Sequence, residues 1–112
     1  MKSFIFGKSS LGLPLFGVDF EKNTTKTSKH VLIIGGVHGD EIEGVVLARA
    51  LMGKLIESPI ENLKVSVVPE FNIEGVLLKT RQNYTGVDLN RNLPTKDWAD
   101  TYKKIRYYPG TS

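Results

Sequence analysis

Residues 30–44 read HVLIIGGVHGDEIEG, and this stretch decides the fold of the chain. It begins with a continuous apolar run, His30–Ile34, of the length that suits a strand buried on both faces in a parallel sheet. Gly35 and Gly36 end the run and let the backbone turn tightly. The apolar residues that follow recur at a helical period. The stretch therefore predicts a strand and a helix that are joined by a glycine-rich turn.

The segment from Glu41 to Ile56 is predicted to be that helix. Its apolar residues fall at three- and four-residue intervals, and they are Ile42, Val45, Ala48, Met52 and Leu55. Pro59 ends the segment, and Lys64–Val68 is a second strand of the buried type. Strand, helix and strand in this order form a βαβ unit, which predicts an α/β fold with parallel pairing.

Outside this unit the pattern is weaker. Leu13–Phe20 is apolar and predicts an earlier strand, whereas Glu21–Lys29 is polar and predicts a surface loop. Glu70–Arg91 is rich in asparagine and glycine, so we expect it to be mostly irregular. Lys96–Tyr107 is predicted to be a short helix. No internal repeat or linker divides the chain.

The composition excludes several classes of function. The 112 residues are 40% hydrophobic and 24% charged, which is typical of a soluble globular protein and suits one domain or part of one. There is no cysteine, so disulfides and thiolate metal sites are excluded. The net charge is +3, but the basic residues are scattered and form no stripe with aromatics, which argues against a nucleic-acid partner. No stretch approaches the roughly 20 apolar residues of a membrane span, so the expected location is the cytoplasm.

A first candidate site lies where the buried strand ends. His38 and Glu41 follow the paired glycines, and in open α/β sheets ligand sites gather beyond the carboxyl ends of strands. The spacing i, i+3 lets both side chains reach one point at the start of a helix. Imidazole and carboxylate are ordinary zinc ligands, and catalytic zinc sites use three protein ligands and a water. The pair predicts part of a metal site, although a histidine beside a loop is often only solvated or bonded to backbone.

A second candidate site is Gly86–Pro94, which reads GVDLNRNLP. Asn90 and Arg91 suit a carboxylate ligand, because arginine offers a planar pair of donors and the asparagine amide adds another hydrogen bond. Arg81 lies ten residues before Arg91 and supplies a second cation, which can stabilise an oxyanion. The alternative is a surface turn that is merely rich in asparagine.

Taken together, these segments resemble the zinc metallocarboxypeptidase family. The shared features are the order His-x-x-Glu, a strand, Asn-x-x-Gly, Arg and Gly-Val-Asp-Leu-Asn-Arg-Asn, at similar spacing. The resemblance runs from about Leu13 to Ser112 and implies an α/β fold with a partly parallel sheet and flanking helices. Within the family the chain is most similar to the bacterial murein peptide amidases, on the strength of residues 6–15, 38–41 and 86–94 and of Trp98.

The resemblance implies a role for each candidate residue. His38 and Glu41 bind Zn²⁺, Arg81 polarises the scissile carbonyl and stabilises the oxyanion, and Asn90 and Arg91 bind the free carboxylate of a peptide substrate. The implied reaction is hydrolysis of an amide bond next to that carboxylate. For the murein peptide amidases the bond is the one between γ-D-glutamate and diaminopimelate in cytoplasmic cell-wall peptides, cleaved during peptidoglycan recycling.

The resemblance also implies parts that are not found in these residues. The family uses a second histidine ligand and a glutamate general base from later sequence, and His30, the other histidine here, is expected to point away from the site. We therefore expect residues 1–112 to be the N-terminal part of a single catalytic domain, truncated before the third ligand and the base. We expect this piece to be inactive by itself, and to associate with itself or with the missing half through unpaired strand edges.

Three alternatives stay open at this point. The first is an acylase of the succinylglutamate desuccinylase and aspartoacylase type, which also uses a His-x-x-Glu zinc pair and an Asn-Arg pair. The second is a peptidase that removes ordinary C-terminal residues. The third is a non-catalytic module that has kept the fold; it is less favoured because the five candidate positions carry the expected residues.

Overall fold

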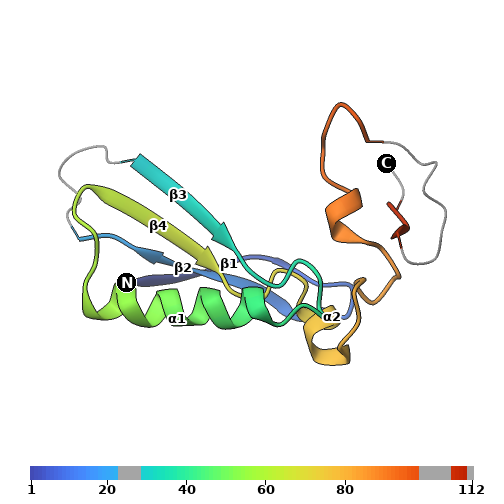
Figure 1. The fold of residues 1–112 in the computed structure, drawn as a ribbon, viewed down its shortest axis with the longest axis horizontal. Helices are drawn as coiled ribbons and strands as arrows, with labels where there is room; N and C mark the ends of the chain where they lie inside the picture. Colours follow the sequence, from blue (N-terminus) through green and yellow to red (C-terminus); the bar gives the residue numbers. More distant parts are fainter. Residues whose placement is uncertain (23–28, 99–106, 111–112) are drawn as a thin grey trace.

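The computed structural model describes residues 1–22, 29–98 and 107–110, and its centre is a four-stranded sheet with a helix along one face (Figure 1). In chain order the elements are β1 (Lys2–Lys8), β2 (Pro14–Phe20), β3 (Lys29–Ile34), α1 (Glu43–Glu57), β4 (Leu63–Val68), α2 (Ile73–Leu78) and the 3-10 helix η1 (Leu89–Arg91).

The predicted βαβ unit is confirmed. β3 pairs in parallel with β4, from Lys29 opposite Leu63 to Ile34 opposite Val68, and α1 connects the two strands. The strand order is β1-β2-β4-β3, in which β2 is antiparallel to both of its neighbours. The sheet is therefore mixed, and within the described part of the chain β1 and β3 are its edges.

The hydrophobic core lies between α1 and the sheet. Val45, Ala48 and Leu55 are the buried residues of α1, which agrees with the helical period of the sequence. The core cluster consists of Val18, Phe20, Ala48, Leu55, Val65 and Val67. Burial of branched and aromatic side chains of this size is the main force that holds a helix on a sheet.

On the opposite face of the sheet, hydrogen bonds and an ion pair connect polar side chains of β3, β4 and β2. His30 Nε2 lies 2.7 Å from Ser66 Oγ, and Ser66 donates its hydroxyl hydrogen to Asp19. Lys64 Nζ lies 3.2 Å from a carboxylate oxygen of Asp19. His30 is thus engaged on this face, near the start of β3, as expected of a histidine that points away from the candidate site.

One predicted boundary needs correction. The helix begins at Glu43, not at Glu41, so the carboxylate of Glu41 belongs to the turn before α1. Residues 70–91 are mostly irregular, as predicted, and the short helices α2 and η1 are the regular elements within them. Asn72 starts α2 by accepting a hydrogen bond from Gly75 N–H at 3.0 Å, which is an N-cap that the asparagine-rich composition masked.

The strand β1 was not predicted. Its sequence KSFIFGK has only a short apolar run, but its backbone pairs with β2 and its Phe4 ring lies over Gly17, where no side chain stands in the way. Most of the helix predicted over Lys96–Tyr107 falls outside the described residues. None of the helices in the described residues has the length and hydropathy of a membrane span.

Candidate active site

Two loops leave the carboxyl ends of the parallel strands side by side. Gly35 N–H donates to Val68 carbonyl at 2.8 Å, which extends the pairing of β3 and β4 by one step. Phe71 and Asn72 N–H then donate to the carbonyls of Gly35 and Gly36, each at 2.9 Å. Gly36 has φ of 66°, a left-handed conformation that favours glycine. The loop of the first candidate site is therefore fixed by backbone bonds to the loop after β4.

The loop 37–42 also packs closely against α2. A Cβ on Gly39 would lie 1.9 Å from the backbone carbon of Gly75, so no side chain fits there. Asn72 Nδ2 donates to the carbonyls of Val37 and Arg81, both at 3.3 Å. One buried amide thus connects the loop that carries His38 with the segment that carries Arg81.

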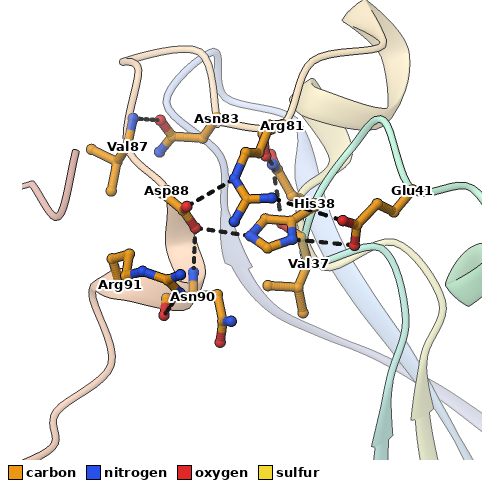
Figure 2. Close-up of polar contacts among 10 residues, drawn as sticks. Val37, His38, Glu41, Arg81, Asn83, Val87, Asp88, Asn90 and Arg91 are labelled. Carbon is orange, nitrogen blue, oxygen red and sulfur yellow. Dashed lines mark hydrogen bonds and ion pairs between the residues drawn. The ribbon is translucent and has the colours of Figure 1, made fainter. Parts of the chain in front are cut away.

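His38 and Glu41 face each other at this end of the sheet (Figure 2). Nδ1 of His38 lies 3.2 Å from Oε2 of Glu41, and the main chain between them closes a turn in which Glu41 N–H donates to His38 carbonyl. His38 is buried, whereas the side chain of Glu41 is 61% exposed. The predicted pair therefore forms a half-open corner that solvent can reach from the Glu41 side.

Asp88 holds the other nitrogen of the imidazole. Its Oδ1 lies 2.9 Å from His38 Nε2, and its Oδ2 accepts from Arg81 Nε at 3.0 Å (Figure 2). The residue is completely buried, and its own N–H donates to Tyr108 carbonyl. Sequence reasoning placed Asp88 within the second motif but gave it no role. The signal in the sequence was a carboxylate two residues before Asn90, since histidine ligands of a metal usually donate their second N–H to an oxygen.

The environment of Asp88 fixes its charge. Burial by itself raises the pKa of a carboxyl group, but hydrogen bonds from His38 and Arg81 and the positive charge of Arg81 outweigh it and hold the pKa of Asp88 below its ordinary value. An ionised carboxylate only accepts hydrogen bonds, so His38 Nε2 must carry the hydrogen between them. Nδ1, the nitrogen that faces Glu41, is then the one with a free lone pair when the ring is neutral.

Arg81 lies against the same cluster. Its Nη1 is 3.8 Å from Glu41 Oε1, while its Nε is held by Asp88. The side chain is 13% exposed, so the guanidinium is ordered and close to both members of the predicted metal pair. The arrangement brings together His38, Glu41 and Arg81, three of the five predicted site residues, and Asp88 is the shared partner of His38 and Arg81.

Asn90 and Arg91 lie next to this group on η1. Asp88 starts η1 by accepting a hydrogen bond from Asn90 N–H at 3.0 Å, and Arg91 Nη1 donates to the carbonyl of Asn90 at 3.1 Å. Within the described part of the chain, no hydrogen bond or ion pair joins their side chains to His38 or Glu41. Asn90 is exposed and Arg91 half-buried, so both can receive a ligand from solvent.

The donor set fits a zinc ion. Two ligands about 2.1 Å from zinc at a near-tetrahedral angle lie roughly 3.4 Å apart, close to the 3.2 Å between His38 Nδ1 and Glu41 Oε2. With Asp88 on Nε2, the imidazole presents the lone pair that a metal requires. Across residues 1–22, 29–98 and 107–110 no group of three or more metal-ligating side chains is present, so the described part offers two ligands.

A cavity opens beside the pair. It has a volume of about 310 Å³ and is lined by residues of the loop and of the start of α1, among them Gly36, His38, Glu41 and Gly44. A Cβ on Gly35 would lie 2.5 Å from the carbonyl oxygen of Gly44, so the loop beside the cavity packs too closely for a side chain there. A ligand in it would lie directly against the corner formed by His38 and Glu41.

Comparison with known sequences adds to this geometry. A family model described as zinc carboxypeptidase matches residues 1–109. The chain is 38% identical over 97 residues to murein peptide amidase A of Vibrio campbellii (strain ATCC BAA-1116), covering 85% of this chain and 36% of that protein. It is 35% identical over 95 residues to murein peptide amidase A of Escherichia coli (strain K12), covering 85% and 37%. The chain thus spans little more than a third of the length of these relatives.

Solved structures share the fold. Murein-tripeptide amidase MpaA from Escherichia coli O157 matches with a TM-score of 0.69 at 34% identity, over 87% of this chain and 39% of that one. Thrombin activatable fibrinolysis inhibitor matches with a TM-score of 0.87 at 20% identity, over 98% and 34%, which shows the fold alone. An aspartoacylase family protein from Mesorhizobium loti matches with a TM-score of 0.65 at 28% identity, over 93% and 33%.

Proposed function

Since the chain belongs to the zinc carboxypeptidase family, we propose that it carries the zinc-binding and carboxylate-binding half of an amidase. The reaction is hydrolysis of an amide bond next to a free carboxylate. The observation that supports it best is the corner of His38 and Glu41, with Nδ1 and Oε2 3.2 Å apart and the second imidazole nitrogen held by buried Asp88.

His38 and Glu41 are the proposed zinc ligands. A zinc ion held there supplies a Lewis acid and a bound water whose pKa is lowered toward about 7. The proposed role of Asp88 is to keep the imidazole hydrogen of His38 on Nε2 and to hold the ring in one orientation. Carboxylates that accept a hydrogen bond from a metal-binding histidine commonly do this.

Arg81, Asn90 and Arg91 are the proposed substrate-binding groups. Arg81 lies close to the proposed metal pair, so its guanidinium can meet negative charge that develops on the scissile carbonyl oxygen. Asn90 and Arg91 lie on η1, where solvent reaches both side chains. The amide of Asn90 and the planar pair of donors of Arg91 suit a free carboxylate. Arg81 near the proposed zinc ligands and the carboxylate-binding pair on η1 together favour an amide bond near a free carboxylate as the target.

The proposed substrate is a cell-wall peptide with γ-D-glutamate linked to diaminopimelate, acted on in the cytoplasm during peptidoglycan recycling. The curated relatives named above are murein peptide amidases and match at 35% identity or more, which supports this substrate over an acylated amino acid. The likeness to an aspartoacylase family protein, at 28% identity, makes an acylase the competing outcome of the test.

We propose that residues 1–112 form the N-terminal part of a larger catalytic domain, in which later residues supply the third zinc ligand and the general base. Two ligands are fewer than catalytic zinc sites use, and the described residues offer two at this corner. We further propose that the chain by itself associates with a second copy or with the remaining part of the domain, through the open edge of β3.

A zinc titration tests the metal site. The 112-residue chain and the protein of the complete reading frame are titrated with zinc against a chromophoric chelator. His30→Ala is the control, because His30 lies near the start of β3 and contacts Ser66, whereas the site follows the end of β3. His38→Ala is expected to abolish binding, Asp88→Asn to weaken it about 10–100-fold, and His30→Ala to leave it unchanged. Equal losses in the two histidine variants would contradict the proposed ligand.

An assay of the protein of the complete reading frame tests the reaction. We expect hydrolysis of L-alanyl-γ-D-glutamyl-diaminopimelate and none of N-acetylaspartate or succinylglutamate. Arg81→Gln is expected to lower kcat by about 10²–10³, as for loss of an oxyanion donor, whereas Arg91→Gln chiefly raises KM. Turnover of the acylated amino acids instead of the peptide would favour the acylase, and the 112-residue chain alone is expected to be inactive.

A further inference from the structure

The ring of Tyr107 lies against both candidate arginines. The guanidinium carbon of Arg81 is 5.2 Å from the ring centroid, and that of Arg91 is 5.6 Å from the same centroid. Both distances fall within the roughly 6 Å that defines a cation–π contact. The ring of Tyr107 therefore contacts both Arg81, near the proposed zinc ligands, and Arg91, on η1.

Main-chain contacts of the segment 107–110 place that ring. Tyr108 carbonyl accepts a hydrogen bond from the N–H of buried Asp88 at 2.8 Å. Gly110, at φ of 76°, packs so tightly that a Cβ there would lie 3.2–3.3 Å from Asn92 and Val87. The segment is thus bonded to the residue that also holds His38 and Arg81, and the ring position follows from that backbone.

The two arginines differ in how they are otherwise held. Arg81 is fixed by the carboxylate of Asp88, whereas the side chain of Arg91 contacts the carbonyl of Asn90 and the ring of Tyr107. A carboxylate in place of the ring would occupy the N–H donors of Arg91. An aromatic ring attracts a guanidinium through its electron-rich face and leaves those donors available for a ligand.

We propose that Tyr107 is a positioning residue that holds the guanidinium groups of Arg81 and Arg91 together as one anion clamp. This inference rests on the proposed function, in which the clamp binds the carboxylate of the substrate and meets the charge on its carbonyl. Without the ring, two like charges separate and Arg91 loses its orientation, so anion binding weakens while the fold remains.

Arginine side-chain signals in NMR spectra of the labelled 112-residue chain test the placement of the ring. In the unsubstituted chain the δ-protons of Arg81 and Arg91 are expected to show ring-current shifts away from random-coil values. These shifts are expected to disappear in Tyr107→Leu and to persist in Tyr107→Phe, because phenylalanine keeps the aromatic ring that causes them. Random-coil values for both arginines in the unsubstituted chain would overturn the proposal, whether or not any variant folds.

Titrations with inorganic phosphate and with diaminopimelate, followed through the same signals, test the clamp. Tyr107→Leu is expected to bind phosphate about fivefold more weakly and Tyr107→Phe within about twofold of the unsubstituted chain. Tyr84→Leu is the matched control, since Tyr84 is 58% exposed, and it is expected to change nothing.

Each outcome of these titrations bears on the proposal. Unchanged phosphate binding in Tyr107→Leu, an equal loss in Tyr84→Leu, or no phosphate binding at all would overturn it. Phosphate binding that depends on Tyr107, with no binding of diaminopimelate, would support the clamp and reject the proposed substrate. Phosphate binding therefore tests the positioning role of Tyr107, whereas diaminopimelate binding tests the proposed substrate.

Discussion

Glu74 is a buried carboxylate outside the candidate active site, and each of its oxygens has a donor. Oε1 accepts from Leu11 N–H at 2.7 Å and Oε2 from Tyr84 N–H at 3.0 Å. Burial raises the pKa of Glu74, but these bonds and one from the Ser9 hydroxyl outweigh it, so the pKa lies below its ordinary value. Glu74 therefore ties the turn between β1 and β2 to the loop that follows Arg81.

Replacing Glu74 tests this tie. In Glu74→Gln one of the backbone donors faces an NH₂ group, and we expect the free energy of unfolding at pH 7 to fall by about 1–3 kcal/mol. Because the pKa is lower in the folded than in the unfolded chain, the contribution is present above pH ~4.3 and is lost as the pH falls through the folded pKa.

Urea unfolding at pH 7 and near pH 3 measures the effect, with Glu57→Gln as the control because Glu57 is an exposed residue at the end of α1. The control is expected to change the free energy of unfolding by less than about 0.5 kcal/mol. A difference between Glu74→Gln and the parent chain that is the same at both pH values would contradict the ionic role.

At the scale of elements, two glycines with different surroundings explain how the site loop is held. Gly39 lies where the loop before α1 meets α2, and a Cβ there would clash with the backbone of Gly75. Gly53 lies inside α1, and a Cβ there would meet nothing within 4 Å beyond its neighbours and the backbone of its own helix. The first glycine is required by contact between elements, whereas the second is only an unfavourable residue in a helix.

The same substitution at both positions should have opposite effects. Gly53→Ala is expected to stabilise the chain by up to about 1 kcal/mol, the usual difference between glycine and alanine in a helix interior. Gly39→Ala is expected to destabilise it and to weaken zinc binding, because the loop that carries His38 must move away from α2. Thermal unfolding and zinc titration of the two variants measure these effects; a stabilising Gly39→Ala would show that the loop does not need this close approach.

At the scale of the whole molecule, α1 covers one face of the sheet (Figure 1). The strand order makes β3 an edge strand of the described part. Leu32 and Ile34 of β3 are 58% and 44% exposed. An exposed apolar edge strand offers unpaired backbone groups to another chain. The surface therefore supports the proposal that the isolated chain associates.

Size-exclusion chromatography with light scattering measures that association. We expect the 112-residue chain to elute above its monomer mass at micromolar concentration. Leu32→Lys on β3 should shift it toward the monomer, since a charge on an edge strand opposes pairing. Leu47→Lys, on the outer side of α1 where Leu47 is 70% exposed, should not. A stable monomer of the parent chain, or an equal effect of both lysines, would contradict association through β3.

The sequence by itself determined the central βαβ unit and the location of the candidate site. Apolar runs and helical periods are local patterns, so β3, α1 and β4 could be predicted to within a few residues. The position of His38 and Glu41 after a strand follows from the same pattern, and their spacing brings them together through a single turn. Arg81, Asn90 and Arg91 were candidates because of their donors and charge, and the family resemblance implied their roles, which stay proposals.

The tertiary structure decided how those residues are held. Asp88 reaches His38 across fifty positions of sequence, and Tyr107 meets Arg81 and Arg91 only because the segment 107–110 is bonded to Asp88. β1 likewise depends on a partner outside its own residues, the neighbouring strand β2. Contacts of this kind form between distant segments, and no periodicity in the chain records them.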